Sequence, residues 1–253
     1  MRSIAIVIPT LNEERAVGEV LDRIPVLDLL RDGFETTPYV VDGHSKDATR
    51  EIAERKGARI IFDEGRGKGA AIRTAFSAID ADYLIMVDGD DTYPLEVARE
   101  MVQRLQTHDV VVGSRLKGTI EPGAMTRVNV VGNKLLTLLA QVLFRANISD
   151  LCTGLWGFRS DAVRRLELAA SGFELEADLF AECMFKGCRI AEIPITYRAR
   201  QDRPKLASLK DGWKIGLHLI RKWCISGRIA PSGKRAGSSA RIVRGADTDE
   251  AQP

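Results

Sequence analysis

Short apolar runs alternate with helical patterns through the first half of this chain, and that alternation limits the fold more than any other feature. The apolar runs, each interpreted as a strand, are Ile4–Ile8, Tyr39–Val41, Arg59–Phe62, Tyr83–Val87 and Asp109–Arg115. Four helical patterns follow the first four runs. The first opens with Thr10 and Glu13 at capping-box spacing, and the second runs from about Ser45 to Gly57. The third ends near Ile79, and the fourth runs from Leu95 to about Gln106. Four such alternations predict an α/β fold with a mostly parallel central sheet flanked by helices.

Polar segments follow the ends of these predicted strands. They are Asp42, Arg66–Gly69, Asp88–Asp91 and Ser114–Arg115. Ligands of open parallel sheets bind beyond the carboxyl ends of the strands. The sequence therefore predicts a ligand site where these segments meet.

The second half of the chain breaks this pattern. We expect an almost wholly apolar helix at Thr126–Arg145, a glycine-punctuated loop at Asp150–Arg159, helices near Ser160–Leu168 and Leu175–Lys186, a strand at Arg189–Tyr197 and an amphipathic helix at about Leu209–Ile225. The polar, patternless sequence after Gly227 predicts a disordered tail.

The composition is ordinary for a soluble globular protein, with 45% hydrophobic and 28% charged residues. We expect neither a membrane-spanning segment nor a secretory signal, and the four scattered cysteines favour free thiols in a reducing cytoplasm over a zinc site. The net charge of +2 conceals a basic end, because thirteen Lys and Arg against two Asp lie between Arg198 and Arg244. This end predicts an anionic partner, either lipid or nucleic acid.

Asp88 and Asp90 stand one residue apart directly after a predicted strand, so both carboxylates can turn toward one hard cation. Oxygen ligands favour Mg²⁺ or Mn²⁺, with water and substrate phosphates in the remaining positions. A simple turn closed by Pro94 is the alternative, and the position after the fourth strand favours the metal site. The glycine-rich sequence Glu64–Ala71, which contains Lys68, fits an anion-binding helix start and a plain helix entry equally well.

The chain resembles the family-2 glycosyltransferases in an ordered series of motifs: VIPTLNEE, VVDGHSKDAT, GRGKGAA, VDGDDTYP, VGSRL, GNKLL and CTGLWGFR. The resemblance covers about Ile4 to Leu219, and within the family it is strongest to the synthases that attach a sugar to dolichyl or polyprenyl phosphate. It implies a GT-A fold, a bound Mg²⁺ or Mn²⁺, and inverting transfer of a hexose from a UDP- or GDP-linked sugar to the lipid phosphate. The product would serve as a lipid-linked sugar donor for glycosylation.

The resemblance, together with the glycine-rich loop, assigns roles to individual residues. The nucleotide sugar is expected to contact Pro9, Leu11, Asn12, Glu13, Asp42, Lys68 and Asp88. The metal is expected at Asp88 and Asp90, the acceptor phosphate at Arg115, Arg127 and Lys205, and the catalytic set is Asp90, Arg115 and Arg127.

The chain departs from the family's motifs at two places. Gly43 and His44 replace the second acid and the glycine of the usual Asp-Asp-Gly-Ser, whose first acid, here Asp42, holds the base or ribose. Thr92 and Tyr93 stand where the family often has Gln and His, so Asp91 or water is expected to complete the metal shell.

An acceptor phosphate needs no general base, because its second pKa of about 6 leaves it ionised at neutral pH. Positioning by basic groups is then the main requirement. Glu174, Glu176 and Asp178 are candidate bases for a hydroxyl acceptor, although a solvated, acid-rich helix start is the commoner explanation. A transferase acting on a glycan or protein hydroxyl is therefore one alternative, and a non-enzymatic nucleotide or nucleic-acid binder is another.

Two helices suggest contact with a membrane surface. Thr126–Arg145 is more apolar than an exposed helix tolerates, although a core helix explains it equally well. Trp213 and Trp223 lie on the basic amphipathic helix near the C-terminus, which is typical of helices in the headgroup layer; packing on the sheet is the alternative. We expect peripheral attachment to the cytoplasmic face of a membrane. The expected partners are a nucleotide sugar and a polyprenyl or dolichyl phosphate. A membrane partner subunit is a further candidate, and nucleic acid is not expected as a partner.

The predicted GT-A domain is residues 1–226. Residues 1–116 form its nucleotide-sugar-binding half and residues 117–226 its acceptor- and membrane-facing half, and residues 227–253 are the tail.

Overall fold

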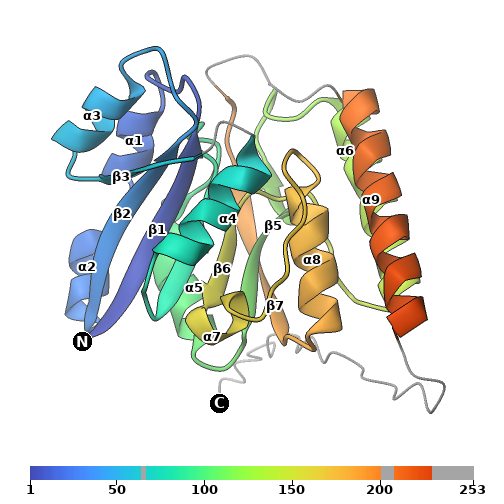
Figure 1. Ribbon diagram of the computed structural model, residues 1–253. Coiled ribbons are helices and arrows are strands. Elements are labelled where there is room, and N and C mark those ends of the chain that lie inside the picture. The colour runs from blue at the N-terminus through green and yellow to red at the C-terminus, as the bar shows by residue number, and fades with distance from the viewer. Residues whose placement is uncertain (64–66, 201–207, 230–253) are drawn as a thin grey trace, which may run out of the picture.

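A computed structural model describes residues 1–63, 67–200 and 208–229 of the chain. Its centre is a seven-stranded sheet in the order β3-β2-β1-β4-β6-β5-β7 (Figure 1). The strands are β1 (Arg2–Thr10), β2 (Phe34–Asp42), β3 (Arg59–Phe62), β4 (Tyr83–Met86), β5 (Val110–Ile120), β6 (Trp156–Arg159) and β7 (Ile190–Tyr197). Only β6 runs antiparallel to its neighbours among these strands, so the predicted mostly parallel sheet is confirmed.

Helices cover both faces of the sheet. They are α1 (Val17–Asp22), α2 (Val26–Arg31), α3 (Thr49–Arg55), α4 (Lys68–Ala78), the 3₁₀ turn η1 (Leu95–Val97), α5 (Ala98–Leu105), α6 (Arg127–Phe144), α7 (Ser160–Val163), α8 (Leu175–Phe185) and α9 (Ser208–Ile229). One apolar core joins the sheet to α4, α6, α7, α8 and α9, and the other joins it to α1, α2, α3 and α5.

The alternation of side chains along β1 explains how one strand serves both cores. Ile4, Ile6 and Ile8 lie in the core with α1 and α5, whereas Ala5 and Val7 lie in the core with α4 and α8. Full burial of an isoleucine contributes about 1.5–3 kcal/mol, so this strand ties the two layers of helices together. A strand buried on both faces has the continuous apolar sequence that β1 shows.

The first predicted helix is wrong at its start. β1 continues through Thr10, and α1 begins only at Val17, with no side-chain cap. The backbone N–H of Glu13 instead donates to Oγ1 of Thr49, at 2.8 Å. A contact between the segment after β1 and the first residue of α3 therefore replaces the predicted local capping box.

Two further expectations in the second half are corrected. The predicted loop at Asp150–Arg159 contains β6, which is inserted between β4 and β5. The predicted helix near Ser160–Leu168 is only the short α7, Ser160–Val163. Pairing with β4 and β5 decides the formation of β6, because that strand has only four residues and one of them is a glycine.

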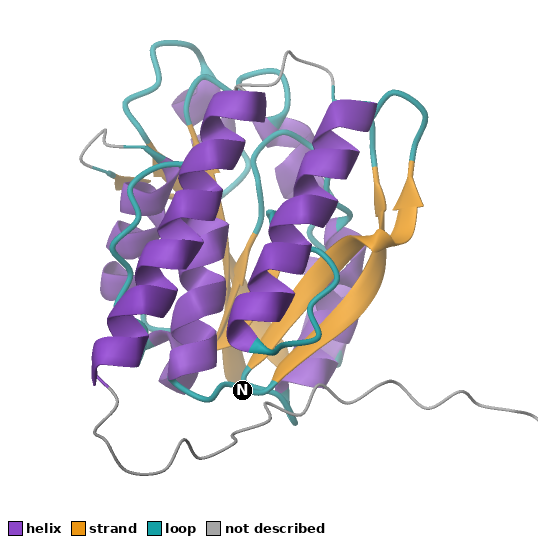
Figure 2. Ribbon diagram, turned by 90° about the vertical axis from the view of Figure 1, so that its right-hand side faces the viewer, coloured by secondary structure: helices purple, strands orange, loops and turns teal. Residues whose placement is uncertain are grey.

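The helices α6 and α9 lie side by side at the edge of the molecule beyond β7 and α8 (Figures 1 and 2). Both were predicted, and α9 extends to Ile229. Among the described residues, no helix has the length and apolar character needed to cross a membrane. The predicted tail lies outside the described residues from 230 onward.

Candidate active site

An acid pair follows β4 at the point where the connections of the sheet change direction. β1 pairs with β2 on one side and with β4 on the other, so the carboxyl ends of β1 and β4 border a crevice. Asp88 is partly exposed there and Asp90 is buried. A Cβ at Gly154 would collide with the Asp88 carboxylate, so the segment before β6 packs directly against the pair. The predicted meeting of Asp88 and Asp90 at this edge is what the structure shows.

Lys68 links the acid pair to α8. Its Nζ lies 2.5 Å from Oδ1 of Asp88 and 2.5 Å from Oε1 of Glu176. The lysine is the first residue of α4, and Gly67 precedes it with a φ of +97°, which glycine adopts without strain. A Cβ at Gly67 would lie 2.8 Å from the carbonyl oxygen of Ser171, so the glycine also permits this close approach.

Arg200, which follows β7, binds Asp90, the second acid of the pair. Its Nη1 lies 3.0 Å from Oδ2 of Asp90, and its Nη2 donates to Oε1 of Glu13 at 3.4 Å. The opposite oxygen of Asp90 accepts from Oγ1 of Thr92, at 2.6 Å. Each acid of the pair therefore has its own cationic partner, Lys68 for Asp88 and Arg200 for Asp90.

Charge crowding governs ionisation in this cluster. Burial raises the pKa of Asp90 above its ordinary value, and the neighbouring charge of Asp88 raises it further. Burial lowers the pKa of Lys68, but Asp88 and Glu176 together outweigh that effect and keep the lysine protonated. Burial also raises the pKa of Glu176, although Lys68 opposes this. Added positive charge beside the acid pair would relieve the repulsion between Asp88 and Asp90.

The donor set fits a hard divalent cation that is shared with a substrate. Within the described ranges, no three His, Cys, Asp or Glu side chains are arranged to hold a metal ion. Asp91 is turned away, because both of its oxygens bind Arg23, at 2.6 and 3.2 Å. Two carboxylates, water and phosphate oxygens are a usual set for Mg²⁺. Of the two candidates expected to complete the metal shell, Asp91 is therefore bound to Arg23, the residue after α1, and water remains.

The turn after β1 is fastened to the loop after β2. The N–H of Asn12 donates to Oγ of Ser45 at 2.9 Å, and Oδ1 of Asn12 accepts from the N–H of Lys46 at 2.8 Å. Asn12 has a φ of +53°, a conformation that asparagine tolerates better than most residues. Pro9 and Leu11 flank this turn, and Leu11 is exposed. The residues expected to border the nucleotide thus surround the ends of β1 and β2.

Asp42 ends β2 and is completely buried. Its Oδ2 accepts from the N–H of Ser45 at 2.9 Å, whereas its Oδ1 has no hydrogen-bond partner among the described residues. The adjacent Gly43 stands where the family usually has a second acid. The carboxylate oxygens of Asp63, from the end of β3, lie 3.7 Å from the position of a Cβ at Gly43. An acid from the neighbouring strand therefore occupies the vicinity of the missing one.

The basic residues expected at the acceptor phosphate have different surroundings. Arg115 is buried, and its Nε and Nη2 each donate to Asp150 at 2.8 Å. Asn133 donates to the same carboxylate at 2.7 Å, which ties α6 to the end of β5. Arg127 is exposed at the first residue of α6. Lys205 lies outside the described residues, so its expected role stays a prediction, as do those of the two arginines.

The acids at the start of α8 are not a solvated helix start, and that interpretation is wrong. Glu176 and Asp178 are buried, and each has a cationic partner. Asp178 binds Nε2 of His218 at 3.0 Å and Nζ of Lys222 at 2.7 Å, both on α9. Partners that are distant in the sequence hold these acids in the interior, and Glu176 lies next to the acid pair.

Two residues of the site were missed by the sequence reasoning, Arg200 as a partner of Asp90 and Glu176 as a partner of Lys68. Arg200 follows the end of β7, so the rule that ligands gather at the carboxyl ends of strands would have found it. Nothing in the local sequence distinguishes Glu176 from its neighbouring acids.

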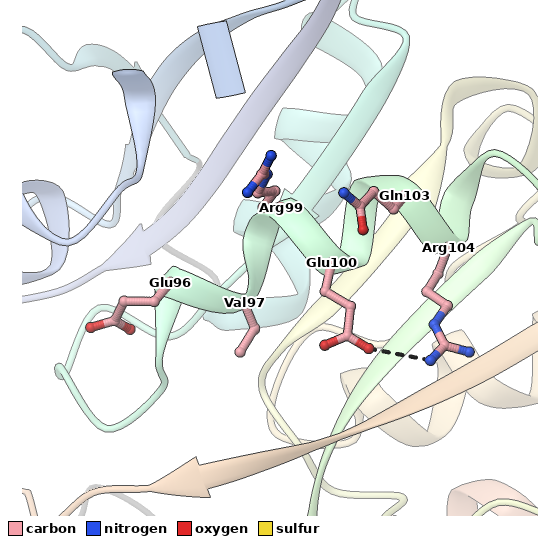
Figure 3. A pocket seen from close by; sticks show the side chains of 6 residues that line it. All are labelled: Glu96, Val97, Arg99, Glu100, Gln103 and Arg104. Atoms are coloured by element: carbon pink, nitrogen blue, oxygen red, sulfur yellow. Dashed lines mark hydrogen bonds and ion pairs between the residues drawn. The ribbon is translucent and has the colours of Figure 1, made fainter. Parts of the chain in front are cut away.

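An open hollow of about 610 Å³ lies elsewhere, along η1 and α5 (Figure 3). Its lining residues all come from that one helical segment: Glu96, Val97, Arg99, Glu100, Gln103 and Arg104. The Glu100–Arg104 pair is an ordinary i,i+4 contact at 3.3 Å. Groups from different elements do not converge there, so the acid pair remains the candidate site.

The sheet order, the crevice between β1 and β4 and the acid pair define a GT-A fold, the class built for nucleotide-sugar transfer. The chain belongs to glycosyl transferase family 2, because the sequence model of that family, described as "Glycosyl transferase family 2", matches residues 5–167. Both results confirm the expectation from the sequence motifs.

Relatives and solved structures support this assignment. Glycosyltransferase AglJ of Haloferax volcanii is 34% identical over 224 residues, which are 87% of this chain and 72% of that protein. The dolichyl-phosphate hexose transferase of the same organism is 36% identical over 227 residues, 89% of this chain and 96% of that protein. The crystal structure of glucosyl-3-phosphoglycerate synthase from Mycobacterium tuberculosis, in complex with Mn²⁺, UDP and glucosyl-3-phosphoglycerate, superimposes with a TM-score of 0.67. It is 25% identical, and the match covers 92% of this chain and 82% of that one.

Proposed function

We propose that this glycosyltransferase moves a hexose from a nucleotide sugar to a dolichyl- or polyprenyl-type lipid phosphate at a membrane surface. The observation that carries the proposal is an exposed apolar face on the adjacent helices α6 and α9. On α6 the exposed residues are Val128, Val131, Leu135, Leu138 and Val142; on α9 they are Trp213, Leu217, Ile220, Trp223 and Ile225. We call these ten residues the α6–α9 face. The similarity to a dolichyl-phosphate hexose transferase supports the same acceptor class.

The spacing on α6 argues against a simple surface or core helix. Its exposed apolar residues recur at intervals of three and four, so they form one stripe along the outer side, while Ala140 faces the core. Basic residues accompany the stripe, including Lys134 on α6 and Lys214 on α9. Apolar side chains with flanking lysines, and two tryptophans, are the composition of helices that lie in the headgroup layer. We therefore expect the protein to attach peripherally through this face, on the side of a membrane where the nucleotide sugar is present.

The face leads into the site through α6. Arg127 begins the helix, and Asn133, about 1.7 turns further, binds the Asp150 carboxylate that also holds Arg115. A lipid tail on the α6–α9 face would therefore have its phosphate near the basic residues at the start of α6. Arg127 is exposed and suited to meet that phosphate. Arg115 is held by Asp150 and contributes fixed positive charge behind it.

Asp88 and Asp90 would hold the divalent metal, with the donor's diphosphate completing its shell. Such a metal neutralises the charge that develops on the departing diphosphate. Lys68 and Arg200 are the two cations that already reach the acid pair, so they are the side chains placed to bind the same diphosphate. The complex of a structural relative with Mn²⁺ and UDP supports this assignment.

The acceptor phosphate attacks without help from a base, because it is ionised at neutral pH. The chain's task is then to align the phosphate oxygen with the anomeric carbon and to exclude water. One displacement at that carbon forms the new C–O bond as the bond to the diphosphate breaks, with inversion. The product is the sugar phosphodiester of the lipid.

One observation favours a second candidate, transfer to a hydroxyl group. Glu176 lies beside the acid pair, and its pKa is raised by burial, as expected for a general base. Its carboxylate is occupied by Lys68 at 2.5 Å, however, so it is not oriented toward an incoming hydroxyl. We therefore prefer the lipid phosphate.

A paired acceptor assay tests the proposal. The full chain is incubated with Mn²⁺, a panel of labelled UDP- and GDP-sugars, and either a short polyprenyl phosphate or the matching polyprenol. We expect label in the organic phase only with the phosphate. Transfer to the polyprenol at a comparable rate would contradict an ionised-phosphate acceptor, and transfer to neither would contradict the lipid acceptor class.

A further inference from the structure

Two cysteines meet where α8 ends. The N–H of Cys188 donates to the carbonyl oxygen of Cys183 at 2.9 Å. The N–H of Gly187 donates to the carbonyl oxygen of Met184 at 3.3 Å, and Gly187 has a φ of +65°. This pair of bonds around a left-handed glycine is the Schellman motif, in which the residue after the glycine contacts the side chain five positions before it. In this chain both of those residues are cysteines.

The two thiols are hydrogen-bonded to each other, with Cys183 as the donor. This bond raises the pKa of Cys183 well above its ordinary value, and burial raises it further. The same bond lowers the pKa of Cys188, although burial opposes the change. The pair therefore has one sulfur that favours the thiolate, Cys188, and one that stays a thiol, Cys183.

Arg165 places a positive charge beside the Cys188 sulfur. Its Nη2 lies 3.9 Å from Sγ of Cys188. Its Nη1 donates to the carbonyl oxygen of Lys186 at 3.4 Å, and its Nε donates to that of Asp161 at 3.2 Å, so two backbone groups hold the guanidinium over the end of α8. A nearby cation stabilises a thiolate, which is the reactive form of cysteine. A cysteine that only fills the core has no use for this contact.

The Cys188 sulfur lies just below the protein surface. Cys188 is buried, but its two neighbours in the chain, Gly187 and Arg189, are exposed. Arg165, whose guanidinium covers the sulfur, is exposed as well. A small uncharged oxidant reaches the sulfur when this one long side chain moves aside, whereas a bulky reagent does not.

The other two cysteines have different surroundings. Burial raises the pKa of Cys152 to about 12, so this residue stays a thiol at neutral pH. Cys224 is exposed on α9. Neither belongs to a pair of hydrogen-bonded thiols among the described residues, so these two cysteines serve as internal references for Cys183 and Cys188.

We propose that Cys183 and Cys188 form a site of reversible oxidation, a dithiol that reacts with hydrogen peroxide and closes to a disulfide at the end of α8. The Cys188 thiolate attacks one oxygen of the peroxide, the O–O bond breaks and hydroxide leaves, which gives a sulfenic acid. The Cys183 sulfur then attacks the Cys188 sulfur, and its proton leaves with the hydroxyl group as water. The dithiol loses two electrons and the peroxide gains them. This chemistry is independent of the donor and the acceptor of sugar transfer.

Peptide mapping of the folded full chain tests the proposal. The protein is treated with hydrogen peroxide, quenched with iodoacetamide and digested with trypsin without a reductant. Because Lys186 lies between the two cysteines, the disulfide joins the tryptic peptides 166–186 and 187–189. We expect this linked pair, and we expect dithiothreitol to separate it. Recovery of the two peptides only in the alkylated form would overturn the proposal. The wild type suffices for this result, so it does not depend on the folding of a variant.

Two variants test which sulfur attacks the peroxide. In Cys183→Ser no thiol resolves the sulfenic acid, so Cys188 should accumulate as the sulfinic acid. In Cys188→Ser the remaining Cys183 should stay reduced, because its thiol is not activated. Oxidation of Cys183 in the second variant at the rate of Cys188 in the first would overturn the assignment of Cys188 as the attacking sulfur. Cys224→Ser should form the linked pair as the wild type does.

Arg165→Met tests the role of the guanidinium. Removal of its charge should slow formation of the linked pair by about threefold or more, because less of Cys188 is then a thiolate. Arg164→Met is the matched control, because the neighbouring Arg164 is exposed and binds Asp80 at 3.0 Å instead of a cysteine. It should react at the wild-type rate. Equal rates in the two variants would overturn the activation of Cys188 by Arg165.

Discussion

The Nη1 atom of Arg200 lies 3.0 Å from Oδ2 of Asp90. A residue that follows β7 therefore binds an acid that follows β4. Lys68 makes the equivalent contact with Asp88 from the start of α4. The two acids therefore bind cations from two segments that are far apart in the sequence. A diphosphate that arrives with a divalent metal can take over both cations while the metal takes over both acids. Charge balance is kept throughout that exchange, which lowers its electrostatic cost.

Substitution of Glu176 by Gln distinguishes the two acceptor classes. If the acceptor is an ionised phosphate, Glu176 acts only on Lys68, and a glutamine still offers an oxygen to that lysine. We expect turnover with a polyprenyl phosphate to stay within about tenfold of the wild type, because no proton transfer is removed. The measurement is the turnover number at saturating donor. A fall of a thousandfold, with the fold intact, would identify Glu176 as a base and favour a hydroxyl acceptor.

Asp178→Asn should reduce stability by a pH-dependent amount. Burial disfavours its charge, but hydrogen bonds from His218, Lys222 and two backbone N–H groups outweigh burial and hold the pKa of Asp178 well below its ordinary value. A depressed carboxyl pKa stabilises the fold above the unfolded pKa of about 3.9, and this stabilisation is lost on acidification. We expect a loss of about 3 kcal/mol at pH 7.

Urea unfolding of the wild type and Asp178→Asn between pH 7 and pH 3 measures this effect. The difference between the two proteins should be greatest at pH 7 and should shrink below about pH 4. Asp161→Asn is the control, because Asp161 forms an exposed pair with Arg159 and should contribute less than about 1 kcal/mol. A difference that is constant with pH would mean that Asp178 acts through packing rather than charge.

The α6–α9 face predicts binding to lipid vesicles. The double variant Leu135→Ser, Leu138→Ser should lower the partition of the protein onto anionic vesicles by at least tenfold, because each buried leucine contributes about 1.5–3 kcal/mol. High salt should weaken binding further by screening the basic residues. Vesicle co-sedimentation at low and high salt measures both effects.

Leu27→Ser supplies the control for that experiment. Leu27 on α2 is as exposed as any leucine of the α6–α9 face, but it lies on the helix layer at the other side of the sheet. Its substitution should leave vesicle binding unchanged. Equal losses in the two variants would mean that general surface hydrophobicity, rather than this face, brings the protein to lipid.

Much of this site was predictable from the sequence, because its acids stand directly after strands that are recognisable as short apolar runs. The strands β1 and β4 are short apolar runs, and the acids of the pair stand directly after the second of them. The carboxyl-end rule then brings them to one edge without knowledge of any long-range contact. The parallel sheet and the acid pair were derived in this way.

The remainder depends on contacts between distant segments. The partner of Arg115 is Asp150, and only the fold shows that this arginine is bound within the protein. The strand β6 exists because two neighbours pair with it, although its four residues include a glycine. Glu176 and Asp178 are similar acids on one turn of α8, yet one faces Lys68 and the other faces α9. A pattern of residue types carries no information on such pairings.

The central claim is that Asp88 and Asp90 hold the metal that activates the donor. Asp90→Asn and Asp91→Asn form a matched pair, because both acids lie in the same turn while Asp91 binds Arg23. Asp90→Asn should lower turnover at least one-hundredfold, the usual loss when a charge-stabilising group is removed. Asp91→Asn should stay within about threefold in turnover and lose about 1 kcal/mol of stability with its ion pair.

The most direct measurement is therefore the rate of sugar transfer to a short polyprenyl phosphate by these two variants, as a function of Mn²⁺ concentration. We predict that Asp91→Asn retains the rate and the Mn²⁺ dependence of the wild type, whereas Asp90→Asn is nearly inactive at every Mn²⁺ concentration. Wild-type turnover by Asp90→Asn, with Mn²⁺ still required, would place the metal elsewhere and contradict the account.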